Sequence, residues 1–313
     1  MILCCGEALI DMIPAPTVTG QDGTGQEGFV PHPGGAVFNT AIALGRLGVR
    51  AGLLTGLSTD MFGRLLAEAL EASHVDASLA ITCERPTTLA FLRLVDGHAS
   101  YSFHDENSAG RMLRPEDMPA LPGEVSALFF GGISLACEPC ADAYAALLAR
   151  EGAARAVMID PNIRPGFIRD IGRYRARLRQ MLARADIVKV SDEDLNWIEP
   201  EPVSLGEKVA RLQQMGPAVV ILTRGGEGAS GYLADGAQVH VPAIPVEIRD
   251  TVGAGDTFNA GLLARLSEMG ALRKPALRAL SAQALREAMA HGARAAAVTV
   301  SRAGANPPWA GEL

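Results

Sequence analysis

Apolar and polar positions form two kinds of stretch along the chain, which predict strands and helices in alternation. Short continuous runs of Val, Ile and Leu are typical of buried parallel strands, and longer runs with apolar residues three or four apart are typical of helices that cover a sheet. The strands are expected at residues 2–5, 53–57, 125–130, 156–160, 187–190 and 219–223, and the helices at 35–47, 62–72, 141–149, 174–185, 257–269 and 281–300. This order predicts an α/β fold of three layers, with a central, mostly parallel sheet between two layers of helices.

Two stretches break this rhythm and predict a second, smaller sheet. Residues 12–33 are rich in Gly, Pro and Thr, and residues 87–103 alternate as a pair of strands around Asp96-Gly97, a hairpin turn signal. Right-handed crossovers bring the loops after the parallel strands to one rim of the main sheet, where ligands bind. We therefore expect a single domain over residues 1–313, with a small β-sheet lid from segments 12–33 and 87–106.

Composition and charge narrow the classes of partner. The 313 residues carry a net charge of −7, which argues against binding to nucleic acid or to an anionic membrane surface. No apolar run approaches the length of a membrane span. The apolar start of the chain lacks a basic region and is interrupted by Glu7 and Asp11, which favours a first strand over a signal peptide. We expect a cytoplasmic protein.

Several features that could carry chemistry have a simpler interpretation. Cys137 and Cys140 form a C-x-x-C, but no second pair or histidine lies close enough in sequence for zinc, so all five cysteines are expected to be unpaired thiols. The arginines of residues 173–184 are interpreted as a solvated helix face. Two G-x-G-x-x-G matches, residues 23–28 and 226–231, lack the strand-then-helix context of a dinucleotide site, and no G-x-x-x-x-G-K-[ST] motif is present.

The stretch DTVGAGD, residues 250–256, predicts a site for phosphoryl transfer. Gly253, Ala254 and Gly255 leave their N–H groups unobstructed, and a helix is expected to begin at about Asp256. A helix N-terminus with free N–H groups binds anions, and such donors stabilise the charge of a transferring phosphoryl group. Asp256 can then accept the proton of an incoming hydroxyl. The alternative is a helix N-cap without catalytic function.

A second group of residues suits a sugar. Gly34 and Gly35 let a ligand approach the backbone, and Asn39 follows on the first turn of the expected helix, where its amide can donate to sugar hydroxyls. Asp11 comes just after the first strand, where a polyol would find a hydrogen-bond acceptor, although it can also be a simple turn residue.

Together these residues resemble the ribokinase-like (PfkB) family of carbohydrate kinases over essentially the whole chain. Gly34-Gly35 with Asn39 resembles the N-terminal signature of that family, and residues 250–256 resemble its C-terminal signature. Further stretches are similar in order: KVSDED at 189–194, TRGGEG at 223–228 and GANPP at 304–308. Where the family often has Asn-x-x-Glu, this chain has Ser191 and Asp194.

The resemblance implies that MgATP and a sugar react to give ADP and a sugar phosphate. It implies Asp256 as the base and Gly253, Ala254 and Gly255 as the anion hole. It also implies residues for the ligands: Asp11, Gly34, Gly35, Asn39 and Arg164 for the sugar; Lys189, Ser191, Thr223, Gly225 and Gly228 for ATP; Asp194 for Mg²⁺ through water; and the carbonyls of Asp250 and Val252 for a monovalent cation such as K⁺.

Within the family, stretches 6–12, 85–91, 130–139 and 160–165 look most like fructokinases, so D-fructose is the expected substrate. A 2-keto-3-deoxygluconate kinase is the alternative. Those kinases tend to have an arginine three residues before a Ser-Ala pair, where this chain has Asp105 before Ser108-Ala109, an acid that would repel a sugar acid. Another sugar or nucleoside kinase, or a non-catalytic sugar- or nucleotide-binding regulator, stays open. We expect a homodimer joined through the lid.

Overall fold

The computed structural model describes residues 1–19, 25–95 and 98–313. Its centre is a sheet with the strand order β15-β14-β13-β12-β11-β10-β1-β4-β6. The strands from β6 to β13 are parallel, and β14 and β15 are antiparallel additions at one edge. The bounds are β1 (Ile2–Cys5), β4 (Ala51–Leu54), β6 (Val75–Asp76), β10 (Ala127–Gly131), β11 (Ala156–Asp160), β12 (Ile187–Ser191), β13 (Val219–Thr223), β14 (Ala229–Leu233) and β15 (Gln238–Val241).

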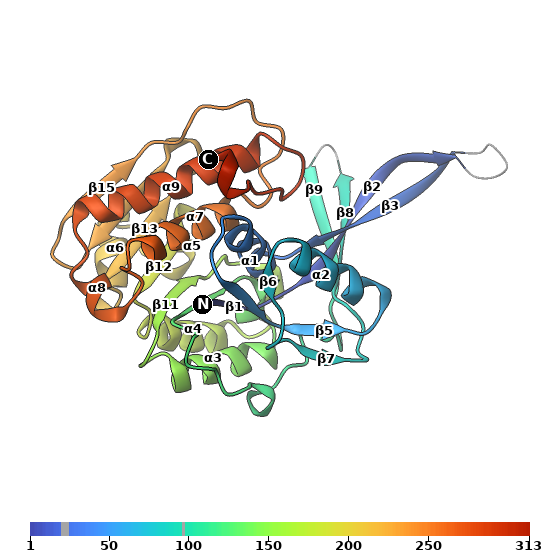
Figure 1. Cartoon of the computed structure of the whole chain (residues 1–313), viewed down its shortest axis with the longest axis horizontal. Helices are drawn as coiled ribbons and strands as arrows, with labels where there is room; N and C mark the ends of the chain where they lie inside the picture. The colour runs from blue at the N-terminus through green and yellow to red at the C-terminus, as the bar shows by residue number, and fades with distance from the viewer. Residues whose placement is uncertain (20–24, 96–97) are drawn as a thin grey trace.

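Helices cover both faces of this sheet, as the apolar runs predict (Figure 1). Neighbouring strand residues separate into two apolar clusters: Cys4 packs with the helices on one face, and Cys5 packs with those on the other. One layer holds α1 (Ala36–Arg46), α2 (Met61–Ala72), α7 (Ala254–Glu268), α8 (Lys274–Arg278) and α9 (Ala282–Val300), and the other holds α3 (Cys140–Glu151), α4 (Ile171–Leu182), α5 (Asp192–Ile198) and α6 (Leu205–Gln214). The predicted three-layer α/β/α fold is confirmed.

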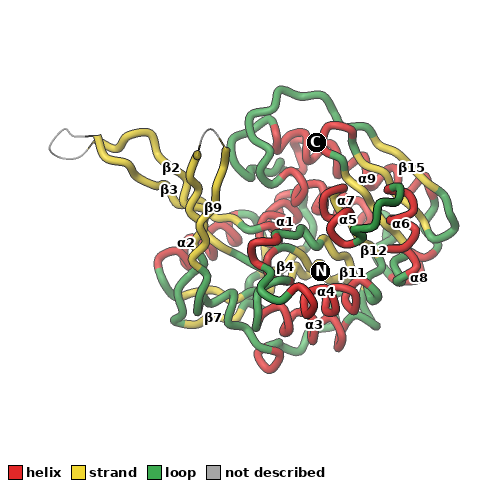
Figure 2. The backbone as a smooth tube through the Cα atoms, turned by 180° about the vertical axis from the view of Figure 1, so that it is seen from behind, coloured by secondary structure: helices red, strands yellow, loops and turns green. Residues whose placement is uncertain are grey.

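A smaller four-stranded sheet projects from one end of the body, and Figure 2 shows it from behind. Its order is β3-β2-β8-β9, with β2 (Leu9–Thr19) and β3 (Gly25–Gly34) paired antiparallel, and β8 (Leu89–Val95) and β9 (His98–His104) likewise. The expected second sheet is therefore present. The hairpin turn predicted at Asp96-Gly97 and the start of the glycine match at Gly23 lie outside the described residues. That this sheet acts as a lid stays a prediction.

Some element boundaries differ from expectation. The run at 53–57 is two strands, because the chain leaves the main sheet after β4 and pairs β5 (Gly56–Ser58) with β7 (Ile81–Cys83) instead. A Cβ on Gly56 would lie 2.1 Å from the Ala109 carbonyl oxygen, so only glycine allows this close passage. The helix expected from about Asp256 begins at Ala254, and α4 begins at Ile171, where the Asp170 side chain caps it.

The arginine-rich helix α4 is more than a solvated face, which corrects the sequence interpretation. Arg177 is only 6% exposed. Its guanidinium donates to the Leu135 carbonyl and to the carboxylates of Glu138 and Asp142, so it fixes the segment before α3. The five cysteines are free thiols, as predicted. Within the described ranges, no helix is long and apolar enough to cross a membrane.

Candidate active site

The turn before α7 is built so that only glycine can begin it. Gly253 has φ 76°, in the left-handed region, and serves as the N-cap of the helix. A Cβ on Gly253 would lie 2.7 Å from the Ala305 Cβ. The first-turn N–H groups of Gly255 and Asp256 lie too early in the helix to have an intrahelical acceptor, which leaves them for an anion. The anion-binding turn therefore has the required local geometry at Gly255 and Asp256, whereas the Ala254 amide, predicted to be free, donates to the Thr251 carbonyl at 3.3 Å.

Asp256 lies in the first turn of α7 and is buried. Its Oδ2 atom accepts a hydrogen bond from Asn39 Nδ2 at 2.9 Å. Burial raises the pKa of Asp256 to about 7, against the hydrogen bond from Asn39, which lowers it. A carboxylate that titrates near neutral pH is suited to take a proton from a hydroxyl group.

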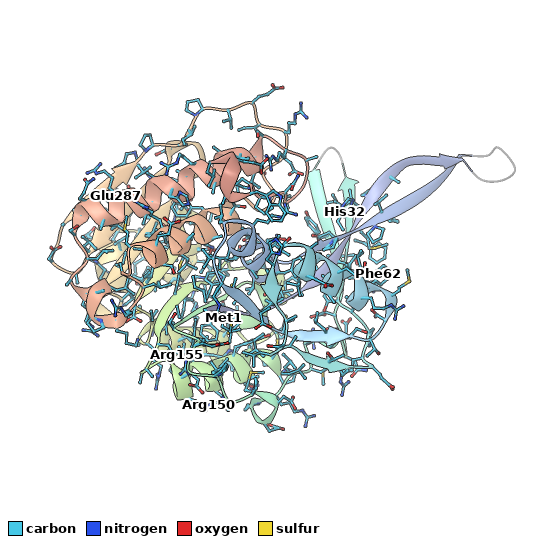
Figure 3. The ribbon with its side chains drawn as sticks, viewed as in Figure 1. Met1, His32, Phe62, Arg150, Arg155 and Glu287 are labelled. Atoms are coloured by element: carbon cyan, nitrogen blue, oxygen red, sulfur yellow. The ribbon has the colours of Figure 1, made fainter. Side chains whose placement is uncertain are left out.

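The residues predicted to hold a sugar gather on the side of Asp256 that faces the small sheet. Asp11 lies in β2 beside Gly34 in β3, where a Cβ would be 2.2 Å from Asp11 Oδ2. Burial raises the pKa of Asp11 to about 6. Gly35 has φ 105° and is the N-cap of α1, whose first turn carries Asn39. In β3, His32 pairs with Asp11 and lies at the base of the small sheet (Figure 3).

Aromatic residues of the small sheet, which the sequence analysis did not single out, border the same region. Burial raises the pKa of Tyr101 in β9, as do the negative charges of Asp11 and Asp250, while Arg164 opposes them. Tyr101 stacks on Phe103, which meets Phe167 edge to face at a centroid distance of 4.5 Å. Phe167 comes three residues after Arg164, so this row of rings ties the small sheet to the loop after β11.

A buried polar cluster lies behind the anion-binding turn, at the ends of β11 and β12. Asp160 Oδ2 accepts from Lys189 Nζ at 2.9 Å and from Asn259 Nδ2 at 2.7 Å. Burial would lower the pKa of Lys189, but the charge of Asp160 and its hydrogen bond raise it, so the side chain is an ammonium group. Lys189 Nζ is 3.3 Å from the position of a Cβ on Gly255. The positive charge of Lys189 therefore lies next to the anion-binding turn.

Asp160 and Asn259 were missed as functional residues. The position of Asp160 could have identified it, because it is a carboxylate at the end of a buried strand, at the rim of the sheet where ligands bind. Asn259 had no such signal, because its partner is 99 residues away. Its position one turn after Asp256 on α7 links the base to this cluster.

The same cluster offers oxygens that suit Mg²⁺ held through water. Asp160 Oδ1 and Asn259 Oδ1 are buried and have no hydrogen-bond partner among the described residues. Asp194 is buried nearby, which raises its pKa, and the charge of Asp160 raises it further. Across residues 1–19, 25–95 and 98–313, no three His, Cys, Asp or Glu side chains come together closely enough to hold a metal directly. Mg²⁺ keeps several waters and needs few direct ligands, so this donor set fits it.

A cavity of about 520 Å³ opens from the anion-binding turn. Ala254 and Gly255 line it at the turn, and Thr223, Gly225 and Gly228, three of the predicted ATP residues, line another wall. Much of the remaining lining is apolar and comes from the loop after β15 and from α9: Ala243, Ile244, Pro245, Val246, Ile248, Ala293, Ala296, Ala297 and Val300. An apolar slot that leads to an anion-binding turn suits a nucleoside triphosphate.

Two of the predicted ATP residues have other contacts in the structure. Within the described part of the chain, Lys189 and Ser191 do not line this cavity. Ser191 caps α5, where its Oγ accepts from the Asp194 amide at 3.0 Å. Lys189 approaches the turn from behind, through its contact with Asp160.

The Asp250 side chain holds its turn from two sides. Its Oδ1 accepts from the Val252 amide at 3.0 Å, and its Oδ2 accepts from the Gly304 amide at 2.9 Å. The turn that carries the candidate cation carbonyls of Asp250 and Val252 is therefore fixed to the loop after α9.

The charge argument made from Asp105 is wrong. Asp105 is only 6% exposed, and its Oδ2 accepts from Arg111 Nη1 at 2.6 Å. The ion pair neutralises the carboxylate, so Asp105 does not repel an acidic sugar. The preference for a neutral sugar must rest on other observations.

Comparison with known proteins gives a consistent result. The pattern of the pfkB family carbohydrate kinases matches residues 1–310. The chain is 50% identical over 288 residues, 91% of its own length and 86% of the other, to a fructokinase of Rhizobium leguminosarum bv. trifolii.

Solved structures agree. A fructokinase of Xylella fastidiosa with bound ATP superposes with a TM-score of 0.88 at 27% identity, covering 97% of this chain and 93% of that one. A fructokinase double mutant of Vibrio cholerae O395 with fructose, ADP and potassium ion gives a TM-score of 0.82 at 26% identity, with the same coverage of 97% and 93%.

Proposed function

Since this chain belongs to the pfkB family of carbohydrate kinases, we propose that it transfers the γ-phosphoryl group of ATP to D-fructose and produces fructose 6-phosphate. The observation that carries the proposal is the position of Asp256. This buried carboxylate, with a pKa of about 7, lies in the first turn of the helix whose N–H groups form the anion site. A base and an anion site at one helix start are what a hydroxyl and a phosphoryl group need.

Each side of the turn has its own part in the reaction. Asp11, Gly34, Gly35 and Asn39 bind the sugar hydroxyls, with Arg164 at the edge. Asp256 accepts the proton of the attacking hydroxyl, while the amides at the start of α7, those of Gly255 and Asp256 among them, and the charge of Lys189 stabilise the phosphoryl oxygens. Thr223, Gly225 and Gly228 bind ATP in the apolar cavity, and Ser191 supports this side by capping α5.

Asp194, with Asp160 and Asn259, would hold Mg²⁺ through water. When bound, the ion neutralises charge on the triphosphate. Asp194 is fixed for this purpose, since its Oδ1 accepts from the Ile163 amide at 2.9 Å. The protein residues themselves align the nucleotide, the turn and the base.

Fructose is favoured because the chain is half identical to a bacterial fructokinase over most of its length, and because a structural neighbour contains fructose. That neighbour also contains potassium ion. We therefore propose that the carbonyls of Asp250 and Val252 bind K⁺, which predicts faster turnover in KCl than in tetramethylammonium chloride at equal ionic strength. Cytoplasmic action is proposed as well, since the free thiols suit a reducing compartment.

A homodimer through the small sheet is supported by its exposed apolar side chains. Phe29, Val30 and Tyr101 are 37%, 44% and 46% exposed, and an open sheet has edges that a second copy can cover. Light scattering should give the mass of two chains for the wild type and of one chain for Val30→Lys. Ile171→Lys, at an isoleucine 59% exposed on α4, is the control and should stay dimeric. A monomeric wild type would contradict the dimer.

The experiment that tests the reaction measures ADP release from MgATP with fructose, 2-keto-3-deoxygluconate, ribose, adenosine and no sugar. Turnover with fructose well above the others supports the proposal. Preference for another acceptor would keep the kinase and replace the sugar. If no acceptor gives turnover while calorimetry detects fructose and ATP, the chain is a binding protein and the kinase proposal fails.

A further inference from the structure

Helix α1 is linked to the start of α7 from both of its ends, directly at one end and through another segment at the other. At its first turn, Asn39 donates to the carboxylate of Asp256. At its last turn, Arg46 contacts the segment of residues 304–309, which follows α9. Figure 1 shows this C-terminal segment, in dark red, passing close to α1 and α9.

Arg46 binds that segment through several groups. Its Nη1 donates to Asn306 Oδ1 at 2.8 Å and to the Pro307 carbonyl at 3.0 Å. Its guanidinium carbon lies 5.4 Å from the centre of the Trp309 ring, a cation–π distance. Its Nε donates to Ser73 Oγ at 3.3 Å, which anchors the arginine on the body of the protein.

The same segment forms one wall of the anion-binding turn. Ala305 leaves no room for a side chain on Gly253, since a Cβ there would be 2.7 Å from the Ala305 Cβ. The Gly304 amide donates to Asp250 Oδ2 at 2.9 Å. The position of residues 304–306 therefore sets the position of the turn, and Arg46 is the side chain that binds this segment at residue 306.

We propose that Arg46 is a positioning residue for phosphoryl transfer. It holds residues 304–309, whose Gly304 amide and Ala305 side chain fix the turn of residues 250–253, while Asn39 at the other end of α1 holds Asp256. Helix α1 thereby fixes the start of α7, which carries both the base and the anion site, relative to the sugar-side residues. This role rests on the proposed kinase function. An arginine suits it because its planar guanidinium donates in several directions at once, to a side chain, a carbonyl and a hydroxyl.

The test compares Arg46→Met, Arg46→Lys and Asn306→Ala with the wild type in steady-state kinetics. Arg46→Met keeps the apolar stem and removes every hydrogen bond, and we expect kcat to fall about tenfold because reacting groups lose alignment. The KM for fructose should stay within about twofold, since the sugar residues are untouched. Arg46→Lys should recover part of kcat. Asn306→Ala removes one acceptor of the Arg46 guanidinium and should show a smaller loss of kcat. This variant tests the proposal if Arg46→Met does not fold.

Arg50→Ala is the matched control. Arg50 lies four residues further on, and its side chain is 74% exposed. Among the described residues, that side chain forms a surface pair with Glu124 at 3.6 Å. It should leave kcat unchanged. Trp309 emission, read in a Trp197→Phe background where it is the one remaining tryptophan, should become more quenchable by acrylamide in Arg46→Met and stay unchanged in Arg50→Ala.

The outcomes separate the two proposals. A wild type without turnover would overturn the kinase function itself. An active wild type, with kcat in folded Arg46→Met and Asn306→Ala both equal to it, would overturn the positioning role alone. A rise in the KM for fructose with unchanged kcat would also overturn it, because it would place Arg46 in sugar binding.

Discussion

Asn39 and Asp256 are joined by a hydrogen bond of 2.9 Å between Nδ2 and Oδ2, across 217 residues of sequence. The first turn of α1, which carries the sugar-side glycines, is thereby fixed to the first turn of α7, which carries the anion site. Asn39 donates an N–H to the carboxylate, so it leaves the base free to accept a proton on its other oxygen. The residue expected to bind the sugar also orients the base.

Removing this hydrogen bond should shift the pH dependence of the reaction. Burial raises the pKa of Asp256 to about 7 and Asn39 opposes that rise. In Asn39→Leu the pKa should increase further, and since the base must be ionised, the acid limb of kcat/KM should move to higher pH. The measurement is the pH profile of kcat/KM for fructose in both proteins. An unchanged acid limb in the variant would show that the limb belongs to another group.

Replacing the base should separate activity from stability. Asp256→Asn should lower kcat by about 10²–10⁴-fold, because it removes the general base, while calorimetry should find fructose still bound.

The stability effect has a definite sign. The folded pKa of Asp256, about 7, is above its ordinary value of 3.8, so its protonation favours the folded state. That stability is fully present below 3.8 and is lost as pH rises through 7. Asp256→Asn has no charge to bury, so its Tm should exceed that of the wild type at pH 8, by more than at pH 5. A Tm difference that does not grow with pH would contradict the burial argument.

The glycine that begins α7 should tolerate no side chain. Gly253→Ala meets both a left-handed φ of 76° and the Ala305 Cβ, so we expect a stability loss of more than about 1 kcal/mol together with a large fall in kcat. Gly236→Ala is the control, because Gly236 has φ 87° with nothing within 4 Å of its Cβ position. Gly236→Ala should lower Tm, because alanine is strained at a positive φ, but it should leave kcat at the wild-type value. Equal kcat in the two variants would argue against a catalytic role for the turn.

Local patterns were enough to predict the parallel strands other than β6, the helices α1 to α4, α7 and α9, and the glycine turn at 253–255, whereas the short helices α5, α6 and α8 were not predicted. These features depend on residues that are neighbours in sequence: continuous apolar runs for the sheet, and small residues before a helix. The second sheet was also predictable from alternation and turn signals.

Pairings between distant polar residues could not be predicted in this way. Arg177 was expected in solvent, but Glu138, which precedes α3, and Asp142, in α3, neutralise it. The sequence analysis treated Asp105 as an unpaired negative charge, but Arg111 forms an ion pair with it. A sequence shows which groups carry charge, whereas the fold decides which charges meet, so burial and pKa follow only from the structure.

The Lys189–Asp160 pair gives a last prediction, on the cost of breaking a buried ion pair. The two side chains are 8% and 3% exposed. Lys189→Met leaves Asp160 buried with Asn259 as its one donor among the described residues, so the free energy of unfolding should fall by about 3–5 kcal/mol. The double variant Lys189→Met, Asp160→Asn should regain much of this stability, because it removes both charges.

The activity of the double variant should not return, since the positive charge behind Gly255 is gone. Lys274→Met, which breaks a more exposed pair with Asp186 (24% and 5% exposed) away from the turn, is the control and should keep kcat. The measurements are urea unfolding and kcat for all variants. Full activity in the double variant would show that Lys189 only balances the charge of Asp160. Stability without activity would show that the pair takes part in phosphoryl transfer, and an active Asp160→Asn single variant would then assign that part to the Lys189 ammonium group.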